Sequence, residues 1–156
     1  ALSIASQLGS DWSGRIVAAD VSPDAVAFAD RNRTRLGHET RVTLVQGSLL
    51  AWTAGPIDLV LANLPYLRPD QIAANPQLAA EPRQALDGGV DGLNYIRRLL
   101  NDAPRTLAPG GAVALEIDPS QREAVVGLAK HVFPEPHVDV LQDLAGLDRH
   151  VTIQTW

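Results

Sequence analysis

The chain has 156 residues, of which 46% are apolar and 20% charged, and its formal net charge is −5. These proportions are ordinary for one globular domain with a hydrophobic core. No apolar run approaches the ~20 residues that a membrane-spanning helix needs, which excludes such a helix. The absence of cysteine excludes disulfides and thiolate metal sites and fits a reducing compartment, so we expect a cytoplasmic protein.

Neither metal binding nor nucleic-acid binding is indicated by the charged and imidazole side chains. The four histidines show no ligand spacing, so we expect no structural metal. Lys130 is the single lysine among 13 basic residues, and the arginines at 31–35 and 97–98 lie in predicted helices. Such clusters are typical of a solvated helix face, whereas nucleic-acid binding needs a basic patch. We therefore expect a protein or small-molecule substrate.

The first part of the chain alternates strand and helix patterns, which favours an α/β fold with a largely parallel sheet. In chain order the patterns predict a helix, a strand, a second helix and two further strands over residues 1–8, 15–20, 23–36, 42–46 and 57–62. Ser22 can cap the second helix, and Pro23 suits its first turn. The strand Ile57–Ala62 is nearly all apolar, which indicates burial on both faces.

The second part of the chain begins with an irregular connection over residues 67–90, rich in proline and glycine. A connection of this length inside a compact domain is usually functional or mobile. It is followed by a predicted helix, strand, helix and two closing strands over residues 92–107, 112–117, 121–132, 137–141 and 151–156. The two closing strands are joined by a short polar link.

The candidate chemistry lies in Asn63-Leu64-Pro65-Tyr66, which follows an apolar strand. Open α/β sheets place ligands at this carboxyl end of their strands. The Asn63 side-chain oxygen and the Leu64 carbonyl can accept hydrogens from a planar NH2 group, and Pro65 biases Leu64 toward an extended conformation. The Tyr66 ring can stack on a planar group. The alternative is an ordinary Asn-Pro turn with a half-buried tyrosine.

At these residues the chain resembles the PrmC/HemK-type methyltransferases, which methylate a glutamine side chain in peptide-chain release factors. Their signature reads Asn-Pro-Pro-Tyr, with Leu64 replacing the first proline here. Similar stretches follow at Glu81–Leu93, Leu115–Ile117 with Gln121, and Asp143–Arg149. The resemblance covers nearly the whole chain, and its longer stretches are more specific than the tetrapeptide, which nucleic-acid methyltransferases also carry.

The resemblance implies a Rossmann-like class I methyltransferase fold, a three-layer sandwich whose mostly parallel sheet has an antiparallel last strand. It implies that residues 1–156 form one catalytic domain and that S-adenosylmethionine is converted to S-adenosylhomocysteine. In the family an apolar strand and a glycine-rich loop precede the helix at residues 1–8. We expect that strand, that loop and an upstream helical domain to lie outside this chain, which makes the domain N-terminally incomplete.

On the cofactor side the expected residues are Asp20, Val21, Ser48, Leu49 and Asn63. Asp20 ends its strand, where an acid can accept both ribose hydroxyls; a role at the start of the next helix is the alternative. Val21 could pack on the adenine. Ser48 stands where the family often has an acid for the adenine amino group, so Ser48 or Leu49 would substitute, with an ordinary turn as the alternative.

Glu81 and Glu116 are further candidates near this site. For Glu81 we favour a lid position or a salt bridge to Arg83 over catalysis, and Glu116 is as compatible with a structural role as with a functional one. The sequence thus predicts N-methylation of a glutamine side chain in a release factor. Two alternatives stay open: N-methylation of an adenine or guanine amino group, and a non-catalytic scaffold with a degenerate cofactor site.

Overall fold

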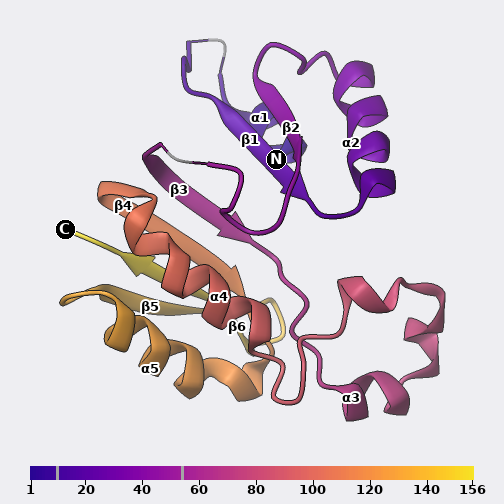
Figure 1. The fold of residues 1–156 in the computed structure, drawn as a ribbon, viewed down its shortest axis with the longest axis vertical. Coiled ribbons are helices and arrows are strands. Elements are labelled where there is room, and N and C mark those ends of the chain that lie inside the picture. The colour runs from indigo at the N-terminus through magenta and orange to yellow at the C-terminus, as the bar shows by residue number, and fades with distance from the viewer. Residues whose placement is uncertain (10, 54) are drawn as a thin grey trace. The chain divides into compact units, whose positions relative to one another are not determined.

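A computed structural model describes residues 1–9, 11–53 and 55–156 (Figure 1). The chain divides into two units, Ala1–Thr53 and Ala54–Trp156. Each unit has its own sheet, of two strands in the first and four in the second. In the described part of the chain, no helix combines the length and hydropathy needed to span a bilayer.

The first unit is a strand–helix–strand segment preceded by a short helix. Its elements are α1 (Leu2–Gln7), β1 (Ile16–Asp20), α2 (Pro23–Arg35) and β2 (Val42–Gln46). β1 and β2 pair in parallel from Ile16↔Val42 to Asp20↔Gln46, so both strands end at the same edge. The hydroxyl of Ser22 accepts the amide of Ala25 at 3.2 Å, which confirms the predicted cap of α2.

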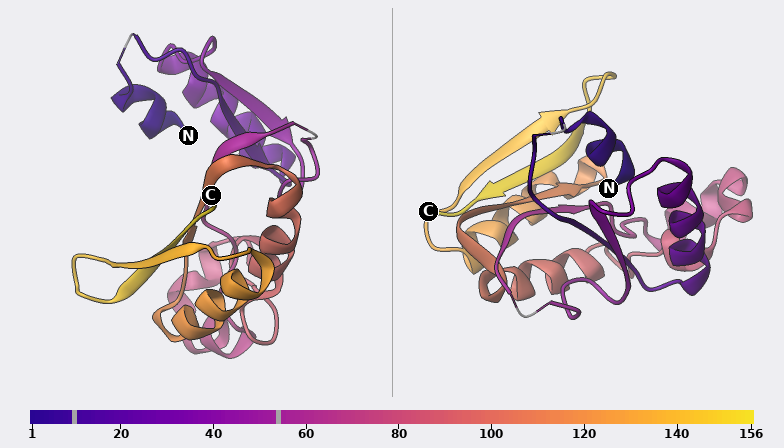
Figure 2. Two further views of the ribbon diagram at one scale, coloured as in Figure 1. Left: turned by 90° about the vertical axis from the view of Figure 1, so that its left-hand side faces the viewer. Right: turned by 90° about the horizontal axis from the view of Figure 1, so that it is seen from above.

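The second unit carries a mixed sheet in the order β3-β4-β6-β5. Its longer elements are β3 (Ile57–Ala62), α3 (Pro69–Ala74), α4 (Asn94–Asp102), β4 (Leu107–Glu116), α5 (Arg122–Val132), β5 (His137–Gln142) and β6 (Asp148–Gln154). β3 and β4 are parallel, and β6 is antiparallel to both β4 and β5. The predicted insertion of an antiparallel last strand is confirmed, and Figure 2 shows the β5–β6 hairpin from two sides.

The core of the second unit lies between the sheet and the adjacent helices α4 and α5. Ile96, Leu99 and Leu100 of α4 are buried because a helical repeat of three and four residues places them on one face. The buried residues of β4 and β6 alternate mainly with half-buried ones, because successive side chains of a strand point to opposite faces. This packed core supports the loops at the carboxyl end of β3 and β4.

The prediction that Ile57–Ala62 is buried on both faces is wrong. Val60 is only 8% exposed, but Leu59 and Leu61 on the opposite face are 53% and 52% exposed. The strand forms as expected and pairs in parallel with β4 on one side. The apolar run therefore identified the strand correctly, whereas the described elements of the second unit leave its second face uncovered.

The observed bounds of several helices and strands differ from the predicted ones. Residues 67–90 contain α3 and two short 3₁₀ helices, η1 (Pro76–Ala80) and η2 (Arg83–Ala85), which are too short to produce a period in the sequence. β4 begins at Leu107 rather than at Ala112, because Pro109, Gly110 and Gly111 are accommodated within the strand, with a register shift opposite β3. The last strand begins at Asp148 rather than at Val151.

Candidate functional site

The predicted motif leaves the sheet directly after Ala62, the last residue of β3. Asn63 is exposed, whereas Leu64, Pro65 and Tyr66 are half-buried. Because β3 and β4 are parallel, Ala62 lies opposite Leu115, and Glu116 ends β4 at the same edge. The motif therefore presents an accessible amide side chain on a backbone that the second unit supports.

The Tyr66 side chain is anchored by Glu116. Its hydroxyl donates a hydrogen bond to Oε1 of Glu116 at 2.9 Å. Burial and the negative charge and hydrogen bond of Glu116 raise the pKa of Tyr66 above 10.0, while the charge of Arg149 opposes that rise. The phenol is therefore neutral at physiological pH and acts as the donor in this pair.

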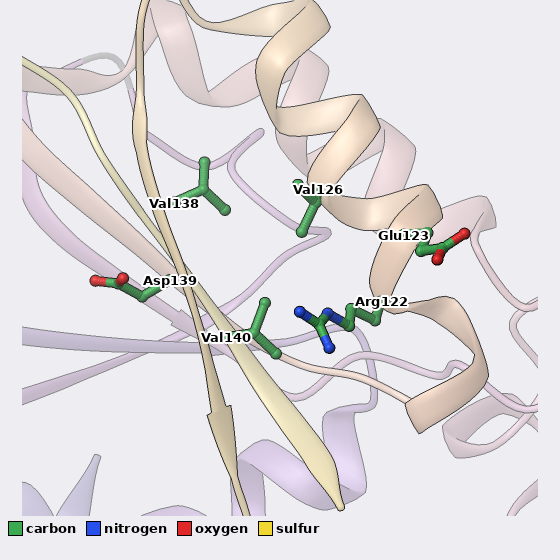
Figure 3. Close-up of a pocket in the computed structure, with 6 residues that line it drawn as sticks. All are labelled: Arg122, Glu123, Val126, Val138, Asp139 and Val140. Carbon is green, nitrogen blue, oxygen red and sulfur yellow. The ribbon is translucent and has the colours of Figure 1, made fainter.

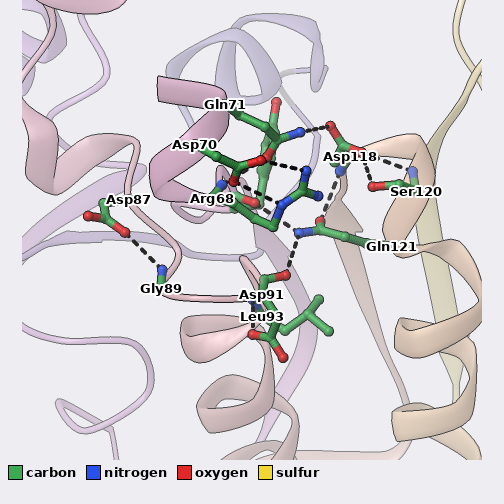
Figure 4. A network of polar contacts seen from close by, with 11 residues as sticks. Arg68, Asp70, Gln71, Asp87, Gly89, Asp91, Leu93, Asp118, Ser120 and Gln121 are labelled. Carbon is green, nitrogen blue, oxygen red and sulfur yellow. Dashed lines mark hydrogen bonds and ion pairs between the residues drawn. The ribbon is translucent and has the colours of Figure 1, made fainter. Parts of the chain in front are cut away.

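The Tyr66 backbone is anchored by Gln121, which is 4% exposed. Its Nε2 donates to the Tyr66 carbonyl at 2.9 Å, and its Oε1 accepts the amide of Asp118 at 3.0 Å (Figure 4). Gln121 ends the short helix η4 (Pro119–Gln121), which precedes α5. A buried amide of this kind ties the motif to the turn that follows β4.

The start of α3 is attached to that same turn. Nε2 of Gln71 donates to Oδ2 of Asp118 at 3.1 Å, and its Oε1 accepts the amide of Arg68 at 2.8 Å (Figure 4). Burial acts to raise the pKa of Asp118, but the hydrogen bonds from Ser120 and Gln71 and the charge of Arg68 outweigh it, so the pKa lies below its ordinary value. The carboxylate thus remains charged while it organises both segments.

Two glycines of the Glu81–Leu93 stretch pack directly on the motif backbone. A Cβ on Gly88 would lie 2.7 Å from the Pro65 carbonyl, and one on Gly92 would lie 2.2 Å from the Tyr66 carbonyl. Gly92 also has a φ of +73°, which favours glycine. The Gly88 amide donates to the Leu67 carbonyl at 2.8 Å. Glycine is therefore required at these positions by close approach of two backbones.

The loop between these glycines is held by its own acidic residues. Asp87 accepts the amide of Gly89 at 3.0 Å, and Asp91 accepts the amide of Leu93 at 3.1 Å while pairing with Arg97. The hydrogen bond from the Gly89 amide is the largest cause that lowers the pKa of Asp87; for Asp91 it is the bond from Arg97. The loop therefore keeps a defined shape next to the motif.

The Asp143–Arg149 stretch forms the turn between β5 and β6 and reaches the same edge. The Asp143 carboxylate accepts the amides of Ala145 at 2.9 Å and Leu147 at 3.1 Å. It also pairs with Nε of Arg149 at 3.2 Å, and Nη1 of Arg149 donates to the Ile117 carbonyl at 3.3 Å. The Arg149 charge acts on both Tyr66 and Glu116, so all stretches that carry the resemblance converge on the motif.

Comparison with known proteins agrees with these motifs. The chain is 44% identical over 137 residues to a release factor glutamine methyltransferase of Moorella thermoacetica, with 86% of this chain and 48% of that protein covered. It is 40% identical over 132 residues to the protein of that name from Rhodospirillum rubrum, covering 83% and 40%. The chain is homologous to release factor glutamine methyltransferases. The resemblance stated from the motifs is confirmed.

The chain matches only part of each relative, and the relatives are named for different substrates. The chain spans about half the length of the curated relatives it matches. A ribosomal protein uL3 glutamine methyltransferase of Bradyrhizobium diazoefficiens is 41% identical over 120 residues, covering 76% of this chain and 36% of that protein. No family model matches the chain.

Solved structures show the fold. A candidate rRNA methylase of Clostridium thermocellum superposes with a TM-score of 0.69 at 20% identity, covering 99% of this chain and 81% of that one. A candidate methyltransferase of Streptococcus mutans, solved with SAH, superposes with a TM-score of 0.55 at 19% identity, covering 91% and 76%. The fold is that of a class I methyltransferase, as predicted.

In this methyltransferase fold the predicted cofactor residues of the first unit gather at one edge. Asp20 ends β1 and Val21 follows it, while Ser48 and Leu49 follow the end of the parallel neighbour β2. Asp20 and Val21 are exposed, and Ser48 and Leu49 are half-buried. Leu49 has a φ of +50°, an uncommon value for leucine that marks a tight turn.

Asp20 also has a structural role at the start of α2, the alternative that the sequence suggested for it. Its Oδ1 accepts the amide of Ser22 at 2.8 Å, so Ser22 is not the only side chain organising the start of α2. An ionised carboxylate has about four acceptor sites. The hydrogen bond from the Ser22 amide uses only one of them. The exposed Asp20 can therefore still accept hydrogen bonds from hydroxyl groups, which fits a ribose. Asn63, the fifth predicted residue, belongs to the second unit.

The structure corrects the expected partner of Arg83 and shows a contact of Glu116 that the sequence left open. Arg83 pairs with Asp87 at 3.1 Å rather than with Glu81, because Asp87 lies one helical turn further along. Glu116 contacts the motif, although alternation along its strand could not distinguish a structural from a functional role. Residues 1–9, 11–53 and 55–156 contain no group of three histidine or acidic residues able to hold a metal.

A shallow hollow of about 510 Å³ lies elsewhere, between α5 and β5. Figure 3 shows Val126 of α5 and Val138 and Val140 of β5 at its wall, with Arg122 and Glu123 at the helix start. None of the predicted site residues lines this hollow.

Proposed function

We propose that this chain is part of an enzyme that methylates the side-chain amide nitrogen of a glutamine in a peptide-chain release factor. The arrangement at the end of β3 carries the proposal: Asn63 is exposed, and Tyr66 beside it is anchored at its hydroxyl and at its carbonyl. The names of the curated relatives support the reaction and the substrate. A release factor acts in translation, so a cytoplasmic location follows from the same proposal.

The motif suits an amide because an amide nitrogen is a poor nucleophile. Its lone pair is delocalised into the carbonyl, and a site must accept its hydrogens so that the lone pair points outward. The Asn63 side-chain oxygen and the Leu64 carbonyl are the proposed acceptors, and the Tyr66 ring is the proposed wall for the planar group. Leu64 in place of proline keeps the same backbone carbonyl.

S-adenosylmethionine supplies a methyl group on a positively charged sulfur. Asp20 is proposed to accept the ribose hydroxyls, Val21 to pack on the adenine, and Ser48 or Leu49 to contact its amino group. When bound, the cofactor would give its methyl group to the amide nitrogen, its sulfur would keep the electron pair of the broken carbon–sulfur bond, and the nitrogen would lose a proton to solvent. Alignment of such reactants can contribute roughly 7–11 kcal/mol.

A ribosomal protein is the second candidate substrate, since one relative is named for glutamine methylation of uL3. The chemistry at Asn63 would be the same. Nucleic acid is disfavoured by the net charge of −5. We therefore place the release factor first and the ribosomal protein second.

The test is a labelling assay with the full-length protein and cofactor carrying a labelled methyl group. Separate reactions contain a release factor, the same factor with alanine at the candidate glutamine, ribosomal protein uL3, and ribosomal RNA. We expect label only in the factor that retains its glutamine. Equal labelling of the glutamine and alanine forms would contradict the proposal, and label in uL3 alone would replace the first substrate by the second.

A matched pair of variants links the activity to the motif. Asn63→Ala removes the proposed acceptor, and labelling is expected to fall by about a hundredfold or more because the hydrogen bond that would orient the amide is lost. Asn101→Ala changes an exposed asparagine at the end of α4 and serves as the control. If both variants label the substrate equally well, Asn63 does not bind the amide.

A further inference from the structure

Glu116 contacts the aromatic end of the motif from the neighbouring strand β4. It ends β4 opposite the end of β3, and its Oε1 accepts the Tyr66 hydroxyl at 2.9 Å. It is half-buried at this edge of the sheet. No element of the proposed reaction described above uses it, so its role requires a separate explanation.

A hydrogen bond to the hydroxyl of a tyrosine restricts the orientation of its ring. The hydroxyl oxygen lies on the long axis of the ring, so an acceptor placed there selects one of the staggered χ1 positions and fixes the direction of that axis. The Tyr66 backbone is fixed independently, because Gln121 holds its carbonyl at 2.9 Å and Gly92 packs against it. With both ends held, the ring has one position relative to Asn63.

We infer that Glu116 is a positioning residue, which accepts the Tyr66 hydroxyl and thereby places the ring as the wall against the substrate amide. It acts through its acceptor oxygen and not as a general base. The catalytic consequence of this inference rests on the proposed function. The hydrogen bond between Tyr66 and Glu116 lies within the second unit and does not depend on that function. Arg149, which is held by Asp143, interacts electrostatically with both Tyr66 and Glu116 at this edge.

The alternatives predict different behaviour of two substitutions. A general base at Glu116 would be lost equally in Glu116→Ala and Glu116→Gln, because neither side chain accepts a proton at neutral pH. An acceptor for Tyr66 is lost in Glu116→Ala but kept in Glu116→Gln, whose amide oxygen can still accept a hydroxyl. A residue with only a structural role would affect activity independently of the Tyr66 hydroxyl.

The first measurement is a double-mutant cycle on kcat for release-factor methylation by the full-length protein. We expect Glu116→Ala to lower kcat on the order of tenfold to a hundredfold, a range typical of a displaced reacting group, with KM for S-adenosylmethionine unchanged. Glu116→Gln should recover most of that loss. In a Tyr66→Phe background, Glu116→Ala should have no further effect, because the hydroxyl it positions is gone. Glu123→Ala, on the exposed face of α5, is the matched control.

Equal loss in Glu116→Ala and Glu116→Gln would overturn the inference in favour of a base. Additive losses in the Tyr66→Phe background would overturn it in favour of a role unconnected with the ring. If Glu116→Ala does not fold, the comparison of Glu116→Gln with wild type in both backgrounds still decides, since the acceptor predicts near-equal rates and the base predicts a large loss.

A second measurement does not depend on activity and separates this inference from the proposed function. In the full-length protein, the phenol signal that disappears from an NMR titration on Tyr66→Phe substitution belongs to Tyr66 and reports its pKa. Replacing Glu116 by alanine should lower the pKa of Tyr66, since the carboxylate acts to raise it. An unchanged titration would show that the contact is absent, whatever the enzyme methylates.

Discussion

Close contact between two backbones is what the glycines at the motif make possible. Gly92 approaches the Tyr66 carbonyl so closely that a Cβ would lie 2.2 Å from it, in a residue with a φ of +73°. Gly127, in the middle of α5, has nothing within 4 Å of the same position. The two glycines therefore serve as a matched pair with opposite expectations.

Gly92→Ala is expected to lower the free energy of unfolding by about 1–3 kcal/mol or more, because the loop and the motif must move apart. Gly127→Ala should raise it by about 0.5–1 kcal/mol through the better helix propensity of alanine. Urea unfolding of both variants beside wild type measures the difference. Destabilisation of similar size by both would show that the close approach at Gly92 does not occur.

Gln121 is the second residue with a large expected effect. Gln121→Leu places an apolar side chain of similar size in the buried position but leaves the Tyr66 carbonyl and the Asp118 amide without their partner, which should cost about 1–3 kcal/mol. Gln84→Leu, at an exposed position of the same region, is the control. Thermal denaturation of the two variants checks this, and equal melting temperatures would contradict the bridging role.

Some residues of the candidate site could be predicted from the sequence, whereas the contacts that support them could not. Asn63 and Tyr66 were predictable because they follow an apolar strand in a recognisable motif. The contacts of Glu116 and Gln121 with Tyr66 were not, because they depend on the register of β3 against β4 and on the turn after β4. A parallel pair with both carboxyl ends at one edge is the signal that points to Glu116.

At the scale of elements, the turn between β5 and β6 is organised by one carboxylate. The hydrogen bond from the Leu147 amide is the largest cause that lowers the pKa of Asp143 below its ordinary value of 3.8, with Ala145 and Arg149 adding to it. The folded state therefore binds fewer protons than the unfolded state near that pH. The stabilisation is complete above 3.8 and is lost as the pH falls through the lower, folded-state value.

Asp143→Asn should accordingly melt at a lower temperature than wild type near pH 6, because it loses the charge that pairs with Arg149. The difference between the two proteins should shrink as the pH falls to about 3, since the wild-type carboxylate is then increasingly protonated. Calorimetry across that range is the measurement. A gap that stays constant would show that the charge of Asp143 does not contribute.

Most of the elements were predictable, and the errors share a physical origin. The helices and strands were found wherever a period or a cap marks them, as at Ser22 and along α4. Residues 67–90 gave no such pattern because their helices have three to six residues. Burial of both faces of β3 was inferred from apolar composition alone, which does not report what covers each face.

At the scale of the whole molecule, the two units carry different halves of the predicted chemistry. Asp20, Val21, Ser48 and Leu49 lie together in the first, and the motif with its supports lies in the second. The assignment of these residues to cofactor and substrate stays a prediction, as does the expected glycine-rich strand and loop outside the chain. The homology, by contrast, was readable from the sequence because three separate stretches share it.

The central claim is that the Asn63–Tyr66 motif directs a methyl group to the amide nitrogen of a protein glutamine. Tandem mass spectrometry of a release factor incubated with the full-length protein and S-adenosylmethionine tests it most directly. We predict the mass of one methyl group on the side-chain nitrogen of a single glutamine, absent when the enzyme carries Asn63→Ala. A methyl group on any other residue type, or an unchanged yield with Asn63→Ala, would contradict the account.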